Sequence, residues 1–250
     1  MTISRRRFLF AAGGGGLALA GCDRLDRSTG FRDLLRSAEG LTMRAQRLIV
    51  PRDALAPEYA PSDMSPVFRS NGTRLPDTSE YARHLAEGFA NWRLAVDGLV
   101  ARPLSIPLQA LRALPARTQI TRHDCVEGWS AIGKWHGVAL GRLLEAAGLG
   151  SRAKFIVFHC ADMFGPRPYY ESIDLIDAFH PQTILAWGMN DRLLPVANGA
   201  PLRLRVERQL GYKHAKYVQR VEAVASLEGL HGGRGGYWED VGDYEWYAGI

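Results

Sequence analysis

The stretch RHDCVEGWS, residues 122–130, places a histidine two positions before Cys125 and a glutamate two positions after it. The chain has only two other cysteines, Cys22 and Cys160. A thiolate is a soft metal ligand and a good nucleophile, and both roles need neighbours that hold it deprotonated and in place. This stretch is therefore the first candidate for a functional site.

The residues alone leave several roles open for Cys125. A zinc site could draw on His123, His136, His159 or Cys160, but their spacing is not that of a paired zinc motif. A nucleophilic cysteine with a histidine base is chemically allowed, although no local signature supports it. A disulfide with Cys160 would persist in an oxidising compartment, and a core cysteine without chemistry is the remaining alternative.

The first residues predict export. Arg5, Arg6 and Arg7 precede Phe8 and an apolar run rich in alanine and glycine, which is the pattern of a twin-arginine signal peptide over residues 1–21. The run is shorter than the roughly 20 apolar residues of a transmembrane span. We therefore expect a periplasmic protein, exported by a route typical of proteins that fold around a cofactor first.

The end of this segment, Leu19-Ala20-Gly21-Cys22, resembles a bacterial lipoprotein cleavage box. In that interpretation Cys22 becomes the lipid-anchored first residue. The alternative is an ordinary signal peptidase site near Ala20. Both interpretations place the protein outside the cytoplasmic membrane.

Composition and charge narrow the class of protein. The 250 residues are 46% hydrophobic and 23% charged, which is typical of a soluble globular domain. The formal charge is +5, and most of it comes from Arg5, Arg6 and Arg7. The remaining excess is too small to indicate a nucleic-acid partner.

The patterning predicts four regions and an α+β, mostly β, single domain. Residues 22–90 are expected to form an N-terminal tether and arm, residues 91–226 the structured domain, and residues 227–250 a tail rich in glycine, tyrosine and tryptophan that is suited to fold back as a cover. Strands are predicted at 92–97, 118–124, 155–158, 202–207 and 216–224, a hairpin at 184–194, and helices at 107–114 and 138–147.

Two blocks of sequence resemble one family. RHDCVEGWS together with KWHGVALGRLLEAAG (134–148), and LLPVANGAPLRLRVERQLGYKHAKYVQRVE (193–222), are similar to the sulfite-oxidase superfamily of molybdopterin enzymes. The likeness is greatest to its bacterial branch of periplasmic methionine-sulfoxide reductase catalytic subunits. The resemblance implies the sulfite-oxidase molybdopterin-binding fold and a Mo-molybdopterin cofactor, with Cys125 as the protein's thiolate on molybdenum.

The resemblance also implies a set of cofactor-binding residues. Arginine, lysine and amide groups suit the anionic phosphate and the polar ring of a pterin. Glu127 is expected to act with Cys125 in catalysis by relaying protons. The other positions carried over are Asn71, Arg74, Leu75, Cys160, Asn198, Arg203, His214, Ala215 and Lys216, with His214 and Ala215 contributing backbone groups.

The resemblance implies oxygen-atom transfer, with reduction of S-oxide or N-oxide substrates favoured by the glutamate in CVEGWS. Sulfite oxidation on the same cofactor is one alternative, and Arg122, Arg167 and Arg192 could then attract the anion. A cofactor-free periplasmic binding lipoprotein with a Cys125–Cys160 disulfide is the other. We expect a monomer that acts on a small oxide or oxyanion and exchanges electrons with a separate partner, such as a membrane haem protein or a cytochrome.

Overall fold

A computed structural model describes residues 28–250 of the chain. The predicted export signal and Cys22 lie outside these residues. The chain divides into two compact units, the first ending at Ile49 and the second comprising Val50–Ile250.

The first unit contains helix α2 (Thr29–Ile49), which is amphipathic. Leu34, Leu41, Leu48 and Ile49 expose more than half of their surface to solvent. Among residues 28–250, no helix combines the length and the apolar character needed to cross a membrane.

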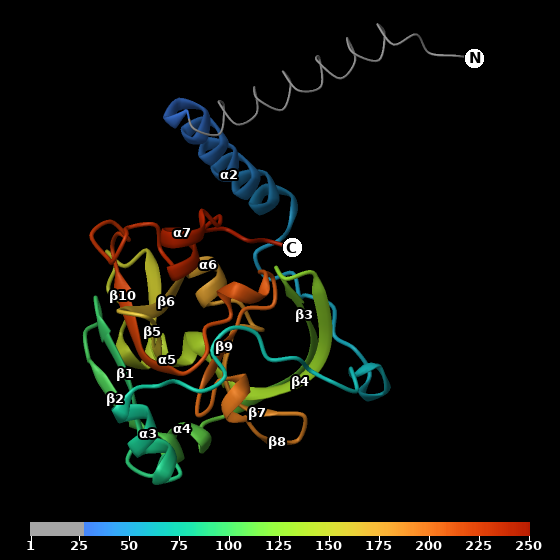
Figure 1. The fold of residues 1–250 in the computed structure, drawn as a ribbon, viewed down its shortest axis with the longest axis vertical. Coiled ribbons are helices and arrows are strands. Elements are labelled where there is room, and N and C mark those ends of the chain that lie inside the picture. The colour runs from blue at the N-terminus through green and yellow to red at the C-terminus, as the bar shows by residue number, and fades with distance from the viewer. Residues whose placement is uncertain (1–27) are drawn as a thin grey trace, which may run out of the picture. The chain divides into compact units, whose positions relative to one another are not determined.

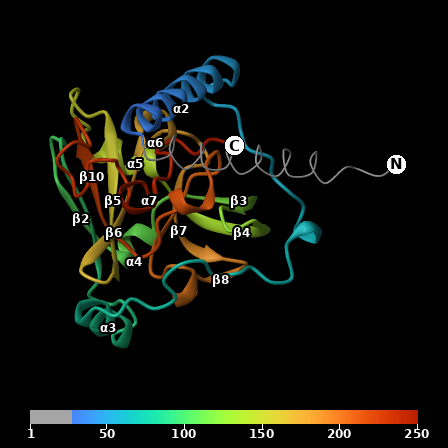
Figure 2. The same ribbon diagram turned by 45° about the horizontal axis from the view of Figure 1, so that its top comes forward.

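The second unit is built on two sheets, which Figures 1 and 2 show on opposite sides of the unit. The first sheet has the strand order β2-β1-β10-β5-β6, in which β1 and β10 are parallel and the other pairs antiparallel. Its strands are β1 (Arg93–Gly98), β2 (Leu104–Pro107), β5 (Phe155–Phe164), β6 (Arg167–Asp174) and β10 (Val218–Val224).

The second sheet carries the stretch that contains Cys125. Its strand order is β3-β4-β7-β8, and β9 pairs with β7 on the same sheet. Its strands are β3 (Ala116–Cys125), β4 (Trp129–Ala139), β7 (Ile184–Met189), β8 (Arg192–Leu193) and β9 (Arg203–Arg205).

Short helices lie before, between and after the strands of the second unit. They are α3 (Ser79–Ala86), α4 (Leu108–Arg112), α5 (Leu140–Ala147), α6 (Leu175–Ala178) and α7 (Tyr237–Gly242), with 3₁₀ turns at Pro61–Asp63, Val196–Asn198 and Gly211–Lys213. Helix α5 buries Leu140, Leu143, Leu144 and Ala147, and ends at Gly148 in the left-handed conformation, which glycine adopts without strain. The main core lies between the sheets, because its buried side chains come from both of them and from α5.

The arm at the start of the second unit, residues 50–78, is held against the second sheet. The Tyr59 N–H donates to the Ile120 carbonyl and the Ser65 N–H to that of Ile132. The Phe68 ring packs edge-on against Trp135 at 5.2 Å between centroids.

The structure confirms the α+β, mostly β, class and most of the predicted elements. The predicted strand at 118–124 is β3, and the predicted hairpin at 184–194 is β7–β8, whose turn residues Asn190 and Asp191 both have positive φ. The predicted helix at 138–147 was wrong at its start. Val138 and Ala139 belong to β4, because both pair with β7, and the helix begins at Leu140.

Candidate active site

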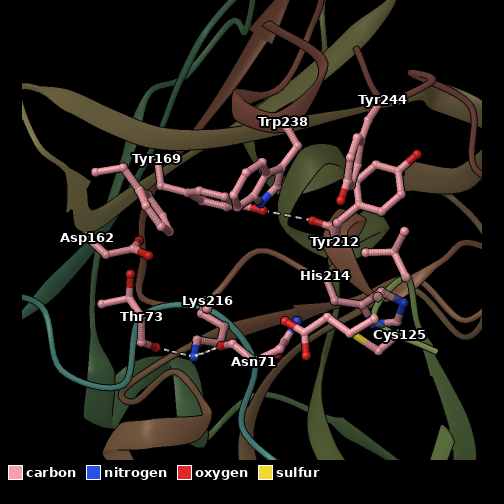
Figure 3. Close-up of a pocket in the computed structure, with 15 residues that line it drawn as sticks. Asn71, Thr73, Cys125, Asp162, Tyr169, Tyr212, His214, Lys216, Trp238 and Tyr244 are labelled. Atoms are coloured by element: carbon pink, nitrogen blue, oxygen red, sulfur yellow. Dashed lines mark hydrogen bonds between the residues drawn. The ribbon is translucent and has the colours of Figure 1, made fainter. Parts of the chain in front are cut away.

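Cys125 is the last residue of β3 and lies at a tight turn into β4. The Gly128 N–H donates to the Cys125 carbonyl at 3.0 Å, and Gly128 has φ of +83°, a conformation that favours glycine. The side chain is 6% exposed and lines a cavity of about 150 Å³ (Figure 3). The turn therefore presents one nearly buried thiol to an enclosed space.

The surroundings of Cys125 do not activate it as a free nucleophile. Burial raises the pKa of its thiol, although a hydrogen bond from the Glu127 backbone N–H and the charge of Arg203 act in the opposite direction. No group of three or more His, Cys, Asp or Glu side chains in the described part of the chain could hold a metal ion. A metal bound to Cys125 would thus take its remaining ligands from a source other than these side chains, such as the dithiolene of a pterin.

The expected Cys125–Cys160 disulfide of the binding-protein alternative is wrong. Both cysteines are free in the structure. Cys160 lies on β5 in the main core, does not line the cavity, and has the pKa of its thiol raised well above the ordinary value by burial. The structure therefore places Cys160 as a small core residue.

Arg203 and Arg205 on β9 are both fully buried, but their surroundings differ. Arg205 forms a paired hydrogen bond with Glu207, at 2.9 and 2.5 Å, and its Nη1 lies 3.0 Å from His123 Nδ1. Within residues 28–250, Arg203 has one hydrogen-bond partner, the Asn198 carbonyl, 3.2 Å from its Nη1, while its Nε and Nη2 have none. Its guanidinium also lies 5.4 Å from the centre of the Trp135 ring. Burial, followed by the charge of Arg205, lowers the pKa of Arg203 to about 9.

Lys216 joins the segment after Phe68 to the turn that contains Asn198. Its Nζ donates to the carbonyls of Asn71 at 2.7 Å and Ala197 at 2.9 Å, and also to that of Thr73. Burial lowers the pKa of Lys216 to about 7. The lysine thus lies on the cavity wall, at the point where the two loops meet.

Several buried polar atoms around this region lack a hydrogen-bond partner in the described residues. Because such atoms cost free energy when unpaired, a cluster of them marks a place where a polar ligand binds. They are Asn71 Oδ1, His123 Nε2, Asn198 Nδ2, Arg203 Nε and Nη2, and His214 Nδ1. The two unpaired guanidinium nitrogens suit an anionic group, and the amides suit a ring with both donors and acceptors. This set fits a molybdopterin.

Two histidines lie in contact beside Cys125. The rings of His123 and His214 are 5.0 Å apart, and burial lowers the pKa of each well below the ordinary value, so both are neutral near pH 7. A Cβ at Gly211 would lie 2.5 Å from His123 Nε2, so this position requires glycine. His123 was not predicted to bind the cofactor, although the motif with Cys125 contains it.

The structure brings most of the predicted site residues together. Asn71, Cys125, Glu127, His214 and Lys216 line the same cavity. Asn198 and Arg203 are hydrogen-bonded to each other, and the charge of Arg203 acts on both Cys125 and Lys216.

The other predicted residues lie elsewhere. Arg74 and Leu75 are exposed and do not line the cavity, although the charge of Arg74 acts on Lys216. His214 lines the cavity, and the backbone N–H groups of His214 and Ala215 form hydrogen bonds within the protein. Their N–H groups donate to the carbonyls of Gly211 and Lys213, respectively.

Sequence reasoning missed the rest of the cavity wall. Asp162 lines it, and burial raises the pKa of this carboxyl to about 6. Five aromatic side chains line the cavity, and the four labelled in Figure 3, Tyr169, Tyr212, Trp238 and Tyr244, lie opposite Cys125, Lys216 and Asn71. This aromatic wall consists of Phe164, Tyr169, Tyr212, Trp238 and Tyr244. For Trp238 and Tyr244, the available signal in the sequence was the abundance of aromatic residues in the C-terminal tail.

Comparisons with known proteins agree with this site. The family described as "Oxidoreductase molybdopterin binding domain" matches residues 82–228. The chain is 45% identical over 160 residues to the "Putative protein-methionine-sulfoxide reductase subunit YedZ1" of Azospira oryzae, covering 64% of this chain and 56% of that protein. It is 37% identical over 171 residues to the "Protein-methionine-sulfoxide reductase catalytic subunit MsrP" of Xanthomonas campestris, covering 64% and 52%. The chain thus spans about half the length of these relatives.

A solved structure supports the fold. The sulfane dehydrogenase SoxCD from Paracoccus pantotrophus superposes with a TM-score of 0.50 at 23% identity, over 55% of this chain and 39% of that chain. At that identity the likeness concerns the fold alone. Since the family match covers more than half of the chain and includes Cys125 and Arg203, the chain belongs to the oxidoreductase molybdopterin-binding domain family, as the sequence resemblance predicted.

Proposed function

We propose that the protein reduces neutral S-oxide or N-oxide compounds at the cavity beside Cys125. The observation that carries this proposal is the charge of the cavity wall. In the described residues the wall contains no arginine, and its two carboxylates, Glu127 and Asp162, outnumber its one lysine, Lys216. A sulfite oxidase must attract a dianion, which carboxylates repel, whereas a neutral oxide is not repelled.

The arginines that could have attracted an anion lie elsewhere. Arg122 is about half exposed and pairs with Asp124 at 2.9 Å. Arg167 and Arg192 are exposed, and neither lines this cavity. These positions support reduction of a neutral oxide over sulfite oxidation.

The cofactor proposed for this chemistry is Mo-molybdopterin. Cys125 would provide the thiolate for the metal, and Arg203, Asn198 and Asn71 carry the unpaired polar atoms suited to the pterin and its phosphate. When bound, this cofactor supplies two-electron oxygen-atom transfer. The protein residues would hold and orient the cofactor, and they would provide charges and protons around the substrate.

Two carboxyl groups can supply the protons that the reduction consumes. Reduction of a sulfoxide consumes two protons and two electrons and yields a thioether and water. Glu127 lies on the cavity wall with its Oε2 accepting a hydrogen bond from Trp129 Nε1 at 3.0 Å. Asp162, whose pKa is raised to about 6 by burial, can hold a proton at that pH.

The electrons are proposed to come from a separate chain. Both relatives described above are named as subunits, which supports a system of more than one chain. A membrane haem protein or a cytochrome is the kind of partner we propose, because the oxide substrate itself supplies no electrons.

The test is a steady-state assay of the purified holoenzyme. With reduced viologen as donor, we expect turnover of methionine sulfoxide, dimethyl sulfoxide or trimethylamine oxide. With ferricyanide as acceptor, we expect sulfite oxidation to be at least about tenfold less efficient, a difference of about 1.4 kcal/mol. Efficient sulfite oxidation without reduction of any oxide would contradict the proposed direction of turnover.

We further propose that the protein is exported by the twin-arginine route and held at the membrane through lipid on Cys22. The exposed leucines of α2, which follows Cys22 closely in sequence, are compatible with a segment that lies at a membrane surface. We expect Cys22→Ala to move the protein from the membrane fraction to the soluble fraction. Mass spectrometry of the wild type that finds no lipid on Cys22 would contradict the anchor, and replacing Arg5 and Arg6 by lysine tests the export route separately.

A further inference from the structure

The C-terminal tail, residues 227–250, supplies two of the five side chains of the aromatic wall. Trp238 lies on α7 and Tyr244 follows that helix, whereas Phe164, Tyr169 and Tyr212 come from β5, β6 and the turn after Leu210. The tail residues that line the cavity lie beyond residues 82–228, which match the family.

The rings support one another. Phe164 stacks on Tyr237 at 4.8 Å between centroids, and its ring lies edge-on to Trp238 at 5.7 Å. Trp238 stacks on Tyr244 at 5.8 Å, and Tyr244 lies edge-on to Tyr212 at 5.0 Å. Aromatic pairs at these distances and angles attract each other, so the wall is a packed surface.

Two of the tyrosine hydroxyls are directed into the protein. The Tyr169 hydroxyl donates to the Tyr212 carbonyl at 2.8 Å, and the Tyr212 hydroxyl donates to the Glu245 carbonyl at 2.6 Å. Both bonds satisfy these hydroxyls away from any ligand. The two tyrosines therefore offer apolar ring surface to the cavity.

Buried ion pairs hold α7 in place. Lys213 Nζ lies 2.5 Å from Glu239 Oε1 on α7 and 2.6 Å from Glu171 Oε2 on β6, and all three side chains are essentially unexposed. The Tyr170 hydroxyl donates to Asp240 at 2.6 Å. Because Glu239 and Asp240 follow Trp238 directly, these bonds fix the position of its ring.

We propose that this aromatic wall is the subsite for the apolar arm of the substrate, and that Trp238 and Tyr244 determine which oxides are accepted. The wall lies across the cavity from Cys125 in Figure 3. A flat, polarisable aromatic surface binds the alkyl or aryl group and the sulfur of a thioether. The substrate class is a neutral sulfoxide with at least one bulky apolar substituent. This inference rests on the proposed sulfoxide reduction.

Trp238→Leu is the test substitution, and Trp246→Leu is the matched control. Trp246 is also a tail tryptophan, but it packs edge-on to Phe155 and donates to Ser172, and it does not line the cavity. For methyl p-tolyl sulfoxide we expect Trp238→Leu to raise KM about tenfold. For dimethyl sulfoxide, whose methyl groups gain little from the wall, we expect a change of less than about twofold. Trp246→Leu should leave the ratio of the two KM values unchanged.

A binding measurement tests the subsite without relying on enzymatic turnover. The dissociation constant of the product thioether, methyl p-tolyl sulfide, is measured by NMR titration of each holoenzyme variant. We expect Trp238→Leu alone to weaken it about tenfold. Equal binding of the sulfide by wild type and Trp238→Leu, or an equal loss in Trp246→Leu, would overturn the subsite. Wild-type protein that binds the sulfide but reduces no sulfoxide would instead overturn the proposed function.

Discussion

Cys125→Ser is expected to abolish turnover, lowering kcat by about 10³-fold or more, while leaving the domain folded. The hydroxyl is nearly the same size as the thiol but is a hard donor that replaces a soft one, so it does not substitute as a metal ligand in this kind of site. Because Cys125 ends β3 and its backbone forms the turn, the hairpin does not depend on the sulfur. The measurements are kcat with reduced viologen, molybdenum content by mass spectrometry, and the melting temperature.

Cys160→Ala is the control for this substitution. Cys160 is also free and buried, but it lies in the core and away from the cavity. Its loss should lower the melting temperature through a small cavity, with kcat retained. Full activity in Cys125→Ser, or equal loss of activity in the two variants, would remove Cys125 from its assigned role.

Arg203→Met is expected to stabilise the cofactor-free protein and to weaken its binding of the cofactor. In the cofactor-free protein the substitution removes a buried guanidinium that has one hydrogen bond, so the free energy of unfolding should rise by about 1–3 kcal/mol. In the loaded protein it removes the donors assigned to the pterin phosphate. The amount of pterin retained after purification should therefore fall, which fluorescence of the acid-released pterin measures.

Arg205→Met is the matched control on the same strand. Arg205 is equally buried but forms a paired hydrogen bond with Glu207, so its removal leaves a buried carboxylate unpaired. We expect this variant to lose about 3–5 kcal/mol even without the cofactor. An Arg203→Met variant that is destabilised as strongly, while retaining its pterin, would show that Arg203 has a structural role alone.

The sequence predicted the elements whose local pattern agrees with their environment. Asn190-Asp191 marked the β7–β8 turn, and the leucines of α5 marked its buried face. The local pattern did not predict β6, because this strand buries Glu171 and Ser172, which read as surface residues. These polar side chains are buried because Lys213 and the tail, both distant in sequence, supply their partners.

The candidate site was predictable where a motif carries the chemistry. Cys125, Glu127 and Lys216 followed from the resemblance, and the structure places them on one cavity. Leucine and arginine alternate in β9, a pattern typical of a strand with one solvated face. Both faces of β9 are in fact buried. The hydrogen-bond partners of Arg203 and Arg205 therefore depend on segments that pack around the strand, and the local sequence could not predict them.

The ion pairs between Lys213 and the tail have a consequence for the order of events during synthesis. The ribosome completes β10 before it makes residues 237–246, so every strand of both sheets exists before the tail does. Until residues 237–246 are made, Lys213 lacks its ion pair with Glu239, and the cavity lacks Trp238 and Tyr244. The growing polypeptide therefore passes through a stage in which the cavity is open on that side, and residues 237–246 close it.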